Sequence, residues 1–391
     1  MRSFNLKILP GGLVLFLAIL ACGPTTLITP NPTASLVPAT LTPSPVPPTA
    51  APTVLPLSVA SSPAIQYLHM LDVNNGWALN NNDVLRTMDG GGTWYNATPI
   101  GVSSMSTCSF FLNNLTAWVV LPGADPTSGT LYHTTDGGSN WTSYPVPFSD
   151  GSMQFIDSSN GWILVGLGGG MSHEAVAVFR TSDGGATWSQ VFTDDPTASV
   201  TSDTLPFVGD KTGLTALDDT HAWVTGSEPV SDFIYLYTTQ DGGQTWSAQN
   251  PSLPSGYAGA MTNALPPSFF SATEGVLQVR AYTDTSATIL YLSHDGGQTW
   301  IASLPVAISG RVSLVSQMNF FVWDGGSTLY ASQNAGTSWT PVTTNINVKD
   351  NLNSFQFVNT TTGWVITSDA SSHYSLYKTT DGGATWNILI P

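Results

Sequence analysis

Most of the side chains that could do chemistry in this chain are carboxylates. Its 391 residues include 25 aspartates and glutamates but only 9 lysines and arginines, which gives a formal net charge of −16. Carboxylates can transfer protons, hold divalent cations or accept hydrogen bonds from the amides of a turn. The charge argues against nucleic acid as a partner, because affinity for nucleic acid comes from basic residues that neutralise phosphates.

One set of carboxylates recurs inside a short motif, whose first copy is Thr87-Met88-Asp89-Gly90-Gly91-Gly92-Thr93-Trp94. The carboxylate can accept hydrogen bonds from the amides of its own turn, and a glycine supplies a backbone angle that other residues resist. We therefore expect a structural and not a catalytic role at this position, and asparagine can fill it in the sixth copy. The seven positions are Asp89, Asp136, Asp183, Asp241, Asp295, Asn334 and Asp381.

A second set of carboxylates lies in loops between the predicted strands of each repeat. A ring of carboxylates there could bind a cationic partner surface or a divalent cation. The structural alternative is that aspartate is a default turn residue. No Asp-x-Asp-x-Asp-Gly calcium loop is present and the six histidines show no metal-ligand spacing, so we predict neither a metal site nor a cofactor. The candidate binding-face residues are Asp83, Asp125, Glu174, Glu228, Asp232, Asp284, Asp324 and Asp369.

The first 63 residues have the composition of an export signal and a spacer. Residues 1–21 combine a basic start with an apolar run, which is typical of a signal peptide. The run ends in Leu17-Ala18-Ile19-Leu20-Ala21-Cys22, which resembles a lipobox and implies cleavage before Cys22 and acylation of its thiol. An ordinary signal peptide or an uncleaved anchor is the alternative. Residues 22–63, rich in Pro, Thr and Ser, predict an extended linker. We expect an extracytoplasmic protein held to the membrane by a lipid at Cys22.

From residue 64 onward the sequence repeats itself seven times. The tryptophans that close the motif stand at positions 94, 141, 188, 246, 300, 339 and 386, and the first three are 47 residues apart. A second motif precedes it, as in Gly76-Trp77 and Gly161-Trp162, although units five and six carry Val276 and Phe321 near that place. Seven units of this length match four-stranded propeller blades. Residues 64–391 therefore predict an all-β fold, a seven-bladed propeller with antiparallel blades.

The motif resembles the Asp-box (BNR) repeat, Ser/Thr-x-Asp-x-Gly-x-x-Trp, which sialidases share. The resemblance implies that the motif turn joins the third and fourth strands of a blade, on the side away from the substrate. The turns before the Gly-Trp strand then share that face. The loops between the second and third strands, with the candidate binding-face residues, lie on the opposite face together with the connections between blades.

The enzymes that share this repeat require residues that are scarce here. A sialidase needs three arginines that together clamp the substrate carboxylate. Residues 22–391 hold only four arginines in all: Arg86, Arg180, Arg280 and Arg311. Arg86 and Arg180 lie at the motif end of their strands, so we do not expect a sialidase. A glycosidase that uses two aspartates stays open, because sequence does not give their spacing in space. Xyloglucan-cleaving enzymes of this repeat place a cleft between two propellers, and one is predicted here.

The units, such as Asn75-Gly76-Trp77-Ala78 followed by the motif, are most similar to those of the photosystem II assembly and stability factor family. That resemblance implies a single propeller that holds partner proteins without catalysis, although the arginine-rich patch of that family is missing. We expect a membrane-tethered, non-enzymatic binding or assembly module with a protein partner. The alternative is a glycan-binding or glycan-cleaving propeller. The sequence leaves open how the ring closes and what the oligomeric state is.

Overall fold

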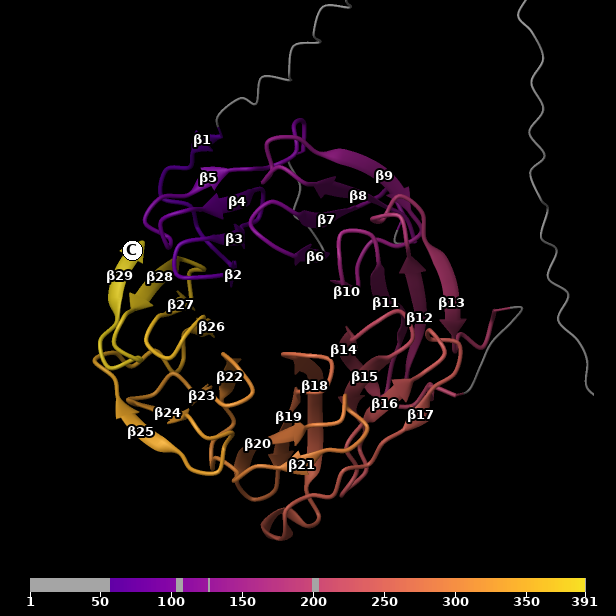
Figure 1. The fold of residues 1–391 in the computed structure, drawn as a ribbon, viewed down its shortest axis with the longest axis vertical. Helices are drawn as coiled ribbons and strands as arrows, with labels where there is room; N and C mark the ends of the chain where they lie inside the picture. Colours follow the sequence, from indigo (N-terminus) through magenta and orange to yellow (C-terminus); the bar gives the residue numbers. More distant parts are fainter. Residues whose placement is uncertain (1–56, 103–107, 126, 199–203, 391) are drawn as a thin grey trace, which may run out of the picture. The chain divides into compact units, whose positions relative to one another are not determined.

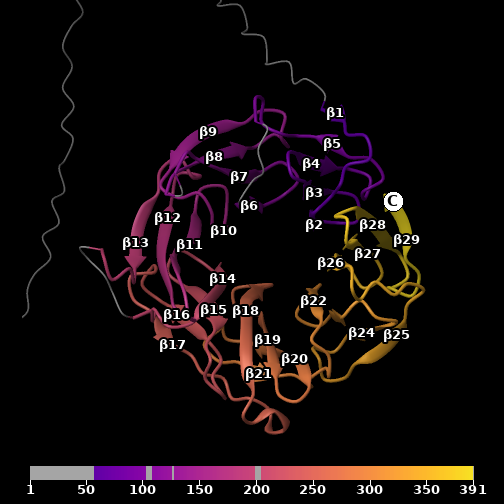
Figure 2. The same cartoon turned by 180° about the vertical axis from the view of Figure 1, so that it is seen from behind.

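The computed structural model describes residues 57–102, 108–125, 127–198 and 204–390. The expected signal peptide, Cys22 and most of the expected linker lie outside these residues. The described residues form seven antiparallel sheets, arranged as the blades of a ring (Figures 1 and 2). This confirms the seven-bladed propeller, and each blade has four strands in chain order from the centre outward. Among the described residues no helix has the length and apolarity needed to cross a membrane.

The innermost and second strands of blades 1 to 7 carry most of the buried apolar residues. The innermost strands, around the centre in Figure 1, are β2 (Tyr67–Met70), β6 (Cys108–Phe111), β10 (Ser152–Phe155), β14 (Asp210–Ala216), β18 (Met261–Phe269), β22 (Arg311–Leu314) and β26 (Leu352–Phe357). The second strands are β3 (Gly76–Leu79), β7 (Ala117–Pro122), β11 (Gly161–Gly169), β15 (Ala222–Ser227), β19 (Gly275–Tyr282), β23 (Phe320–Trp323) and β27 (Gly363–Ser368).

The outer half of each blade consists of the third strand, the motif turn and the fourth strand. The third strands are β4 (Val84–Thr87), β8 (Gly129–Thr134), β12 (Glu174–Thr181), β16 (Leu236–Thr239), β20 (Ser286–Ser293), β24 (Thr328–Ser332) and β28 (Tyr374–Thr379). The fourth strands are β5 (Tyr95–Asn96), β9 (Thr142–Val146), β13 (Ser189–Thr193), β17 (Ser247–Ala248), β21 (Ile301–Ala302), β25 (Thr340–Thr343) and β29 (Asn387–Ile390). One short 3-10 helix, η1 (Ser255–Tyr257), interrupts the connection from blade 4 to blade 5.

This strand order gives the ring two distinct faces. The turns between strands one and two and the motif turns lie on one face, which we call the Asp-box face. The loops between strands two and three and the connections between blades lie on the other, which we call the connection face. Both faces follow from antiparallel pairing, because successive turns alternate between the two ends of a sheet.

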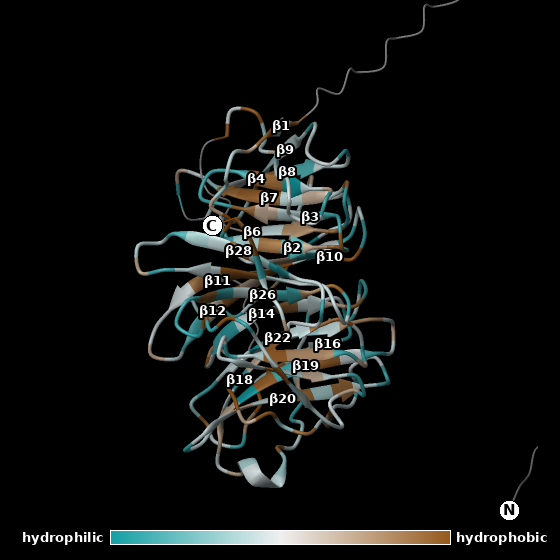
Figure 3. Ribbon diagram, turned by 90° about the vertical axis from the view of Figure 1, so that its left-hand side faces the viewer, coloured by the Kyte–Doolittle hydropathy of each residue, from teal (hydrophilic) through white to brown (hydrophobic). Residues whose placement is uncertain are grey.

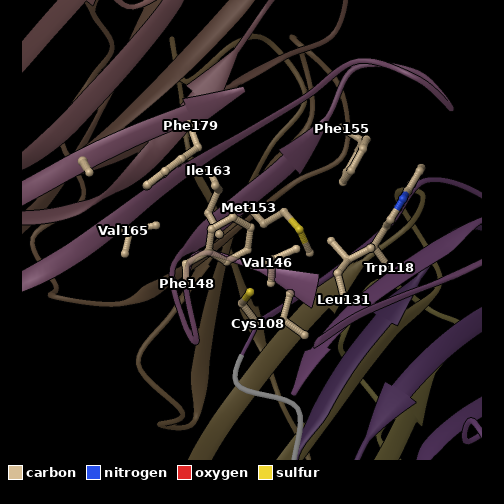
Figure 4. Close-up of a cluster of buried hydrophobic side chains, with 12 residues drawn as sticks. Cys108, Trp118, Leu131, Val146, Phe148, Met153, Phe155, Ile163, Val165 and Phe179 are labelled. Carbon is tan, nitrogen blue, oxygen red and sulfur yellow. The ribbon is translucent and has the colours of Figure 1, made fainter. Parts of the chain in front are cut away.

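The hydrophobic core lies between neighbouring blades, and the tryptophans of the Gly-Trp motif are at its centre. Trp118 is fully buried and stacks on Phe155 of the next blade, with ring centroids 3.7 Å apart (Figure 4). In Figure 3, strands such as β4, β7 and β19 carry brown, apolar residues, and many of the loops are teal or white. Burial of large aromatic side chains between sheets supplies much of the free energy that holds the blades together.

The motif turns are held by their own carboxylates. In blade 3, Asp183 Oδ1 accepts the hydroxyl of Thr181 at 2.8 Å and the amide of Thr187 at 2.9 Å. Two glycines follow with positive φ, as at Gly184 (73°), which L side chains rarely adopt. In blade 6, Asn334 Oδ1 accepts the corresponding bonds from Ser332 and Ser338, so the turn persists without a carboxylate.

The ring closes without exchange of strands. β29 completes blade 7, and blade 1 has four strands of its own with β1 (Ser58–Val59) added outside β5. Closure depends on side chains: Gln356 donates from Nε2 to the carbonyl of Met70 and accepts from the amide of Met70. β1 also lies inside the segment that we expected to be a linker, so ordered structure begins before residue 64.

Four of the seven blade joints share a contact that we call the stacked contact. In blades 7, 1 and 3, a basic residue of the third strand lies over the blade's Gly-Trp indole and donates to a glycine carbonyl in the next blade's motif turn. In blade 7, for example, Lys378 Nζ lies 4.9 Å from the Trp364 ring and 3.2 Å from the Gly90 carbonyl oxygen. In blade 2, His133 takes the place of the cation and stacks on Trp118 at 4.6 Å. The cations of blades 1 and 3 are Arg86 and Arg180.

The joints that follow blades 4, 5 and 6 are made differently. The residues at the corresponding register are Thr238, Leu292 and Ala331, which carry no charge. These joints use what we call connection contacts, made by residues just after the fourth strand. Gln249 donates from Nε2 to the Gly297 carbonyl at 2.9 Å, and Asn345 exchanges two hydrogen bonds with the backbone of Trp386.

Candidate binding site

A cavity of about 990 Å³ opens on the Asp-box face across blades 2 to 5. Its wall consists of the ends of β10, β14 and β18 with the turns that follow them, and part of the blade 5 motif turn. The volume is within the range of sites that hold a small molecule or a few side chains of a partner.

The inner wall of the cavity is apolar because the innermost strands end in aromatic residues. Phe155 is held by its stack on Trp118, and Phe269 lies against Trp223 with centroids 4.6 Å apart. Phe110 and Phe270 extend the wall and are partly exposed. Phenylalanine offers apolar surface without a polar group, so this wall favours an apolar side chain.

An irregularity in β18 shapes the blade 5 side. The pairing with β19 shifts between Leu265 and Ser268, where Pro266 and Pro267 interrupt the ladder. Proline lacks the amide that a ladder needs and is found at bulges and edges. The bulge turns Pro267 and Ser268 toward the cavity, and Ser268 is exposed within it.

Amides and carboxylates form the rim of the cavity, and no lysine or arginine lines it. Gln154 joins blades 3 and 4, because its Oε1 accepts from the amide of Ala216 and its Nε2 donates to the carbonyl of the same residue. Gln240 and Gln298 are exposed in the motif turns of blades 4 and 5. Such groups can exchange hydrogen bonds with a partner backbone.

Asp218 and His221 form a pair at this rim. Asp218 accepts the amides of Thr220 and His221, and its Oδ2 lies 2.9 Å from His221 Nδ1. Partial burial acts to raise the pKa of Asp218, but the hydrogen bonds from Thr220 and His221 outweigh it and lower the pKa to about 2. The carboxylate therefore stays charged near neutral pH and orients the imidazole toward the cavity wall.

The second carboxylate of the rim, Asp295, is also committed to its turn. It accepts the hydroxyl of Ser293 and both the amide and hydroxyl of Thr299. Burial acts to raise its pKa, but hydrogen bonds from Thr299 and Ser293 lower it overall. A general acid at neutral pH needs a raised pKa, so neither carboxylate of this cavity is tuned for acid catalysis.

The structure spreads the candidate binding-face carboxylates around the connection face, and most of them bind groups close by. Asp83 accepts from Asn80 and Asn96, Asp125 from Thr127, Asp232 from the Gly259 amide, and Asp369 from the amides of Ser371 and His373. Asp324 pairs with Lys349 at 3.0 Å. Glu228 is partly exposed and Asp284 is exposed. Among the described residues no group of three or more His, Cys, Asp or Glu is arranged to hold a metal ion.

Glu174, the remaining member of that set, belongs to a buried cluster between blades 3 and 4. Its Oε2 accepts the amide of Lys211 at 2.7 Å. Lys211 Nζ is surrounded by backbone carbonyls, including those of Glu174 and Pro206 at 2.8 Å, and lies 3.9 Å from Asp194 Oδ2. The side chain of Asp194 is only 2 % exposed, and this burial raises its pKa. This cluster fixes the connection between the two blades.

Comparisons with known proteins agree with this architecture. The family profile described as BNR/Asp-box repeat matches residues 237–248, the copy in blade 4. A xyloglucanase from Paenibacillus sp. is 27% identical over 272 residues, which cover 60% of this chain and 24% of that protein. The chain thus spans about a quarter of the length of this relative.

Solved structures show the same fold at low identity. A structure of YCF48 bound to D1 peptide has a TM-score of 0.50 and 18% identity, covering 83% of this chain and 93% of that one. A GH74 xyloglucanase from Xanthomonas campestris has a TM-score of 0.55 and 12% identity, covering 86% and 56%. The fold is therefore a β-propeller and the chain is similar to proteins with the Asp-box repeat, which agrees with the resemblance seen in its own repeats. At these identities the likeness shows the fold alone.

The sequence reasoning did not find the cavity on the Asp-box face. It directed attention to the connection face, because the motif turns were expected to be structural. One signal could have pointed to blade 5, namely the Pro266-Pro267 pair within an innermost strand. It departs from the repeat where the cavity forms.

Proposed function

We propose that this propeller is a non-enzymatic binding module that holds a protein partner through the cavity on its Asp-box face. The observation that carries the proposal is the composition of that cavity, an aromatic wall with an acidic rim. We further propose, from the sequence alone, that the protein acts outside the cytoplasm and is attached to the membrane by a lipid at Cys22.

The wall suits a single apolar anchor on the partner. Buried apolar anchors in well-packed pockets contribute most of the free energy of many protein interfaces. Phe110, Phe269 and Phe270 are partly exposed around the cavity, so an inserted side chain would remove their surface from water. Gln240 and Gln298, which are exposed in neighbouring motif turns, can bind the backbone of a partner beside such an anchor.

The rim selects a partner segment that is neutral or basic. Asp218 and Asp295 are held in the charged form, and the cavity lining has no lysine or arginine to balance them. Complementary charge raises association rates and excludes partners of the wrong sign. The candidate binding-face carboxylates would give the connection face a second acidic surface for a cationic partner.

A glycan is the second candidate ligand, because the xyloglucanase from Paenibacillus sp. is 27% identical over 272 residues. The glutamines of the rim would suit sugar hydroxyls as well as peptide groups. Cleavage of a glycan would need a carboxylate with a raised pKa within reach of the substrate. Asp218 and Asp295 have lowered pKa values, so within this cavity glycan binding is better supported than glycan cleavage.

The test is a binding screen with the full chain against short synthetic peptides and xyloglucan oligosaccharides. We expect peptides with one large apolar residue flanked by Lys or Arg to bind. Ser268→Trp, which fills the cavity, and Gln240→Lys, which adds a positive charge to the acidic rim, should each weaken binding roughly tenfold or more. Gln190→Lys, at an exposed position of the outer strand β13, is the matched control and should leave the affinity unchanged. If only the oligosaccharides bound, and Ser268→Trp weakened that binding, the ligand of the cavity would be a glycan and not a protein.

A further inference from the structure

Among the described residues, every lysine and arginine except two has a structural contact that was given above. Of the nine lysines and arginines, Arg2 and Lys7 lie outside the described residues. Arg86, Arg180 and Lys378 make stacked contacts, Lys211 is buried among carbonyls, and Lys349 pairs with Asp324. The remaining two, Arg280 and Arg311, have no carboxylate within 4.0 Å among the described residues.

Arg280 and Arg311 lie on neighbouring blades at the connection face. Arg280 is near the end of β19 and Arg311 begins β22. Arg280 Nη2 is 3.4 Å from the carbonyl oxygen of Gly310, the residue just before Arg311. Arg311 Nη2 is 3.5 Å from the carbonyl oxygen of Leu352 in blade 7. The two guanidinium groups therefore flank the start of β22, where Arg280 reaches blade 6 and Arg311 reaches blade 7.

Most of the hydrogen-bonding capacity of these two groups is unused. A guanidinium carries five N–H donors, but Arg280 and Arg311 each make only one long hydrogen bond, to a carbonyl. Arg280 Nε is buried and has no acceptor among the described residues. The same holds for Nε2 of Gln278, whose side chain projects from the same face of β19 two residues earlier. Buried donors without acceptors cost free energy, so this joint offers acceptor-seeking groups to a ligand.

The position of Gln278 is apolar in blades 3 and 7, whereas blade 4 carries the buried residue Thr225 there. Gln278 is three residues after the glycine that begins its strand, and the corresponding residues of blades 3 and 7 are Leu164 and Ile366. Those two side chains are apolar and buried. At the blade 5–6 joint the buried cluster is correspondingly small and consists of Val276, Leu290 and Phe320.

Like charges at such a joint oppose the folded state. Burial lowers the pKa of Arg311, and the positive charge of Arg280 lowers it further. A bound anion would remove this repulsion and supply the missing acceptors. Paired arginine forks suit a carboxylate in particular, because its two oxygens accept two parallel N–H bonds.

We propose that Arg280 and Arg311 form a binding site for a carboxylate group on the connection face, around the start of β22. The ligand class is a carboxylate-bearing molecule, and the site is independent of the cavity on the Asp-box face. This inference does not rest on the function proposed above, since the two sites lie on opposite faces.

The test is thermal unfolding of the full chain with glutarate as the probe, at constant ionic strength set with chloride. We expect a saturable rise in Tm, about 3 °C when glutarate reaches roughly 100 times its Kd. Arg280→Gln and Arg311→Gln should each abolish the rise. Lys378→Gln, whose lysine bonds the Gly90 carbonyl of a motif turn on the opposite face, is the control and should keep it. Ser268→Trp should also keep it, which separates this site from the cavity.

Measurements without glutarate distinguish a ligand site from a structural contact. If Arg311 serves an anion, Arg311→Gln removes repulsion and should leave Tm unchanged or raise it. A lower Tm for both arginine variants, with no response of the wild type to glutarate, would reduce the pair to inter-blade contacts and overturn the proposal. An equal rise with chloride would mean charge screening only, and a rise with sulfate but not glutarate would overturn the carboxylate assignment.

Discussion

Two arcs of the same ring are held together by different chemistry. At the joints after blades 7, 1, 2 and 3, a cation or histidine stacks on the Gly-Trp indole. At the joints after blades 4, 5 and 6, the third-strand residue is Thr238, Leu292 or Ala331, and connection contacts such as that of Gln249 bridge the blades. Both arcs keep the same motif turn. The repeat therefore conserves the turn while the joint between blades is free to vary.

The features open to a ligand are in or beside the second arc. The cavity spans blades 2 to 5, and the arginine pair flanks the start of β22 in blade 6. In this arc Val276 and Phe321 replace the indole, and β18 is bulged at its prolines. A joint that does not depend on the stacked contact tolerates polar and irregular residues, because its strength comes from outside the strands.

The largest effect should come from removing an indole in the first arc. Trp364→Ala should lower the free energy of unfolding by about 3–5 kcal/mol, because it leaves a cavity at the joint that closes the ring. Val276→Ala, at the same position of blade 5, should cost about 2 kcal/mol, from ~0.8 kcal/mol for each buried CH₂ removed. Urea unfolding monitored by circular dichroism measures both. Equal losses would show that the two arcs depend equally on this position.

A smaller effect is expected from the cation of the stacked contact. Lys378→Met should cost about 1–2 kcal/mol, because it removes an attraction to the Trp364 ring and a hydrogen bond to the Gly90 carbonyl. A double-mutant cycle with Trp364→Leu should give a coupling energy on the order of 1 kcal/mol. The matched cycle in blade 4, Thr238→Ala with Trp223→Leu, should give less than about 0.5 kcal/mol. Similar coupling energies in blades 7 and 4 would contradict the distinction between stacked contacts and connection contacts.

The smallest effect concerns single turns at low pH. In Asp183, burial acts to raise the pKa, but bonds from Thr187 and Thr181 lower it, and the pKa is lowered likewise in the other five motif aspartates. A carboxylate whose pKa is lower in the folded state than in the unfolded state stabilises the fold at pH values above its unfolded-state pKa. This stabilisation is lost as the pH falls through its folded-state pKa. These turns should therefore loosen below about pH 4, whereas the Asn334 turn should not.

Hydrogen exchange of the turn amides between pH 5 and pH 3 measures this difference. The amide of Thr187 should lose protection in excess of the intrinsic pH dependence of exchange, and the amide of Ser338 should keep it. Asp183→Asn is the control, because it should make blade 3 behave like blade 6. Equal loss at both turns would indicate general acid unfolding instead of local titration.

Local patterns in the sequence were sufficient for the blades. The motif from Thr87 to Trp94 places a turn, and its recurrence gives the number of units, the order of strands and the two faces. These features depend on residues that are close along the chain, where hydrogen-bonding groups and backbone angles are directly readable. The same reasoning assigned residues 58–59 to a linker, because pairing of β1 with β5 spans more than thirty positions and leaves no local pattern.

The sequence by itself determined the repeat, the acidic charge and the role of each motif turn, since these follow from residue types and short spacing. Only the tertiary structure decided how Gln356 closes the ring onto Met70, which cations are left without carboxylates, and where the innermost strands leave a cavity. Each of those depends on which side chains meet across a joint between blades. Contacts of that kind join residues far apart in the chain, and their geometry is set by packing of whole sheets.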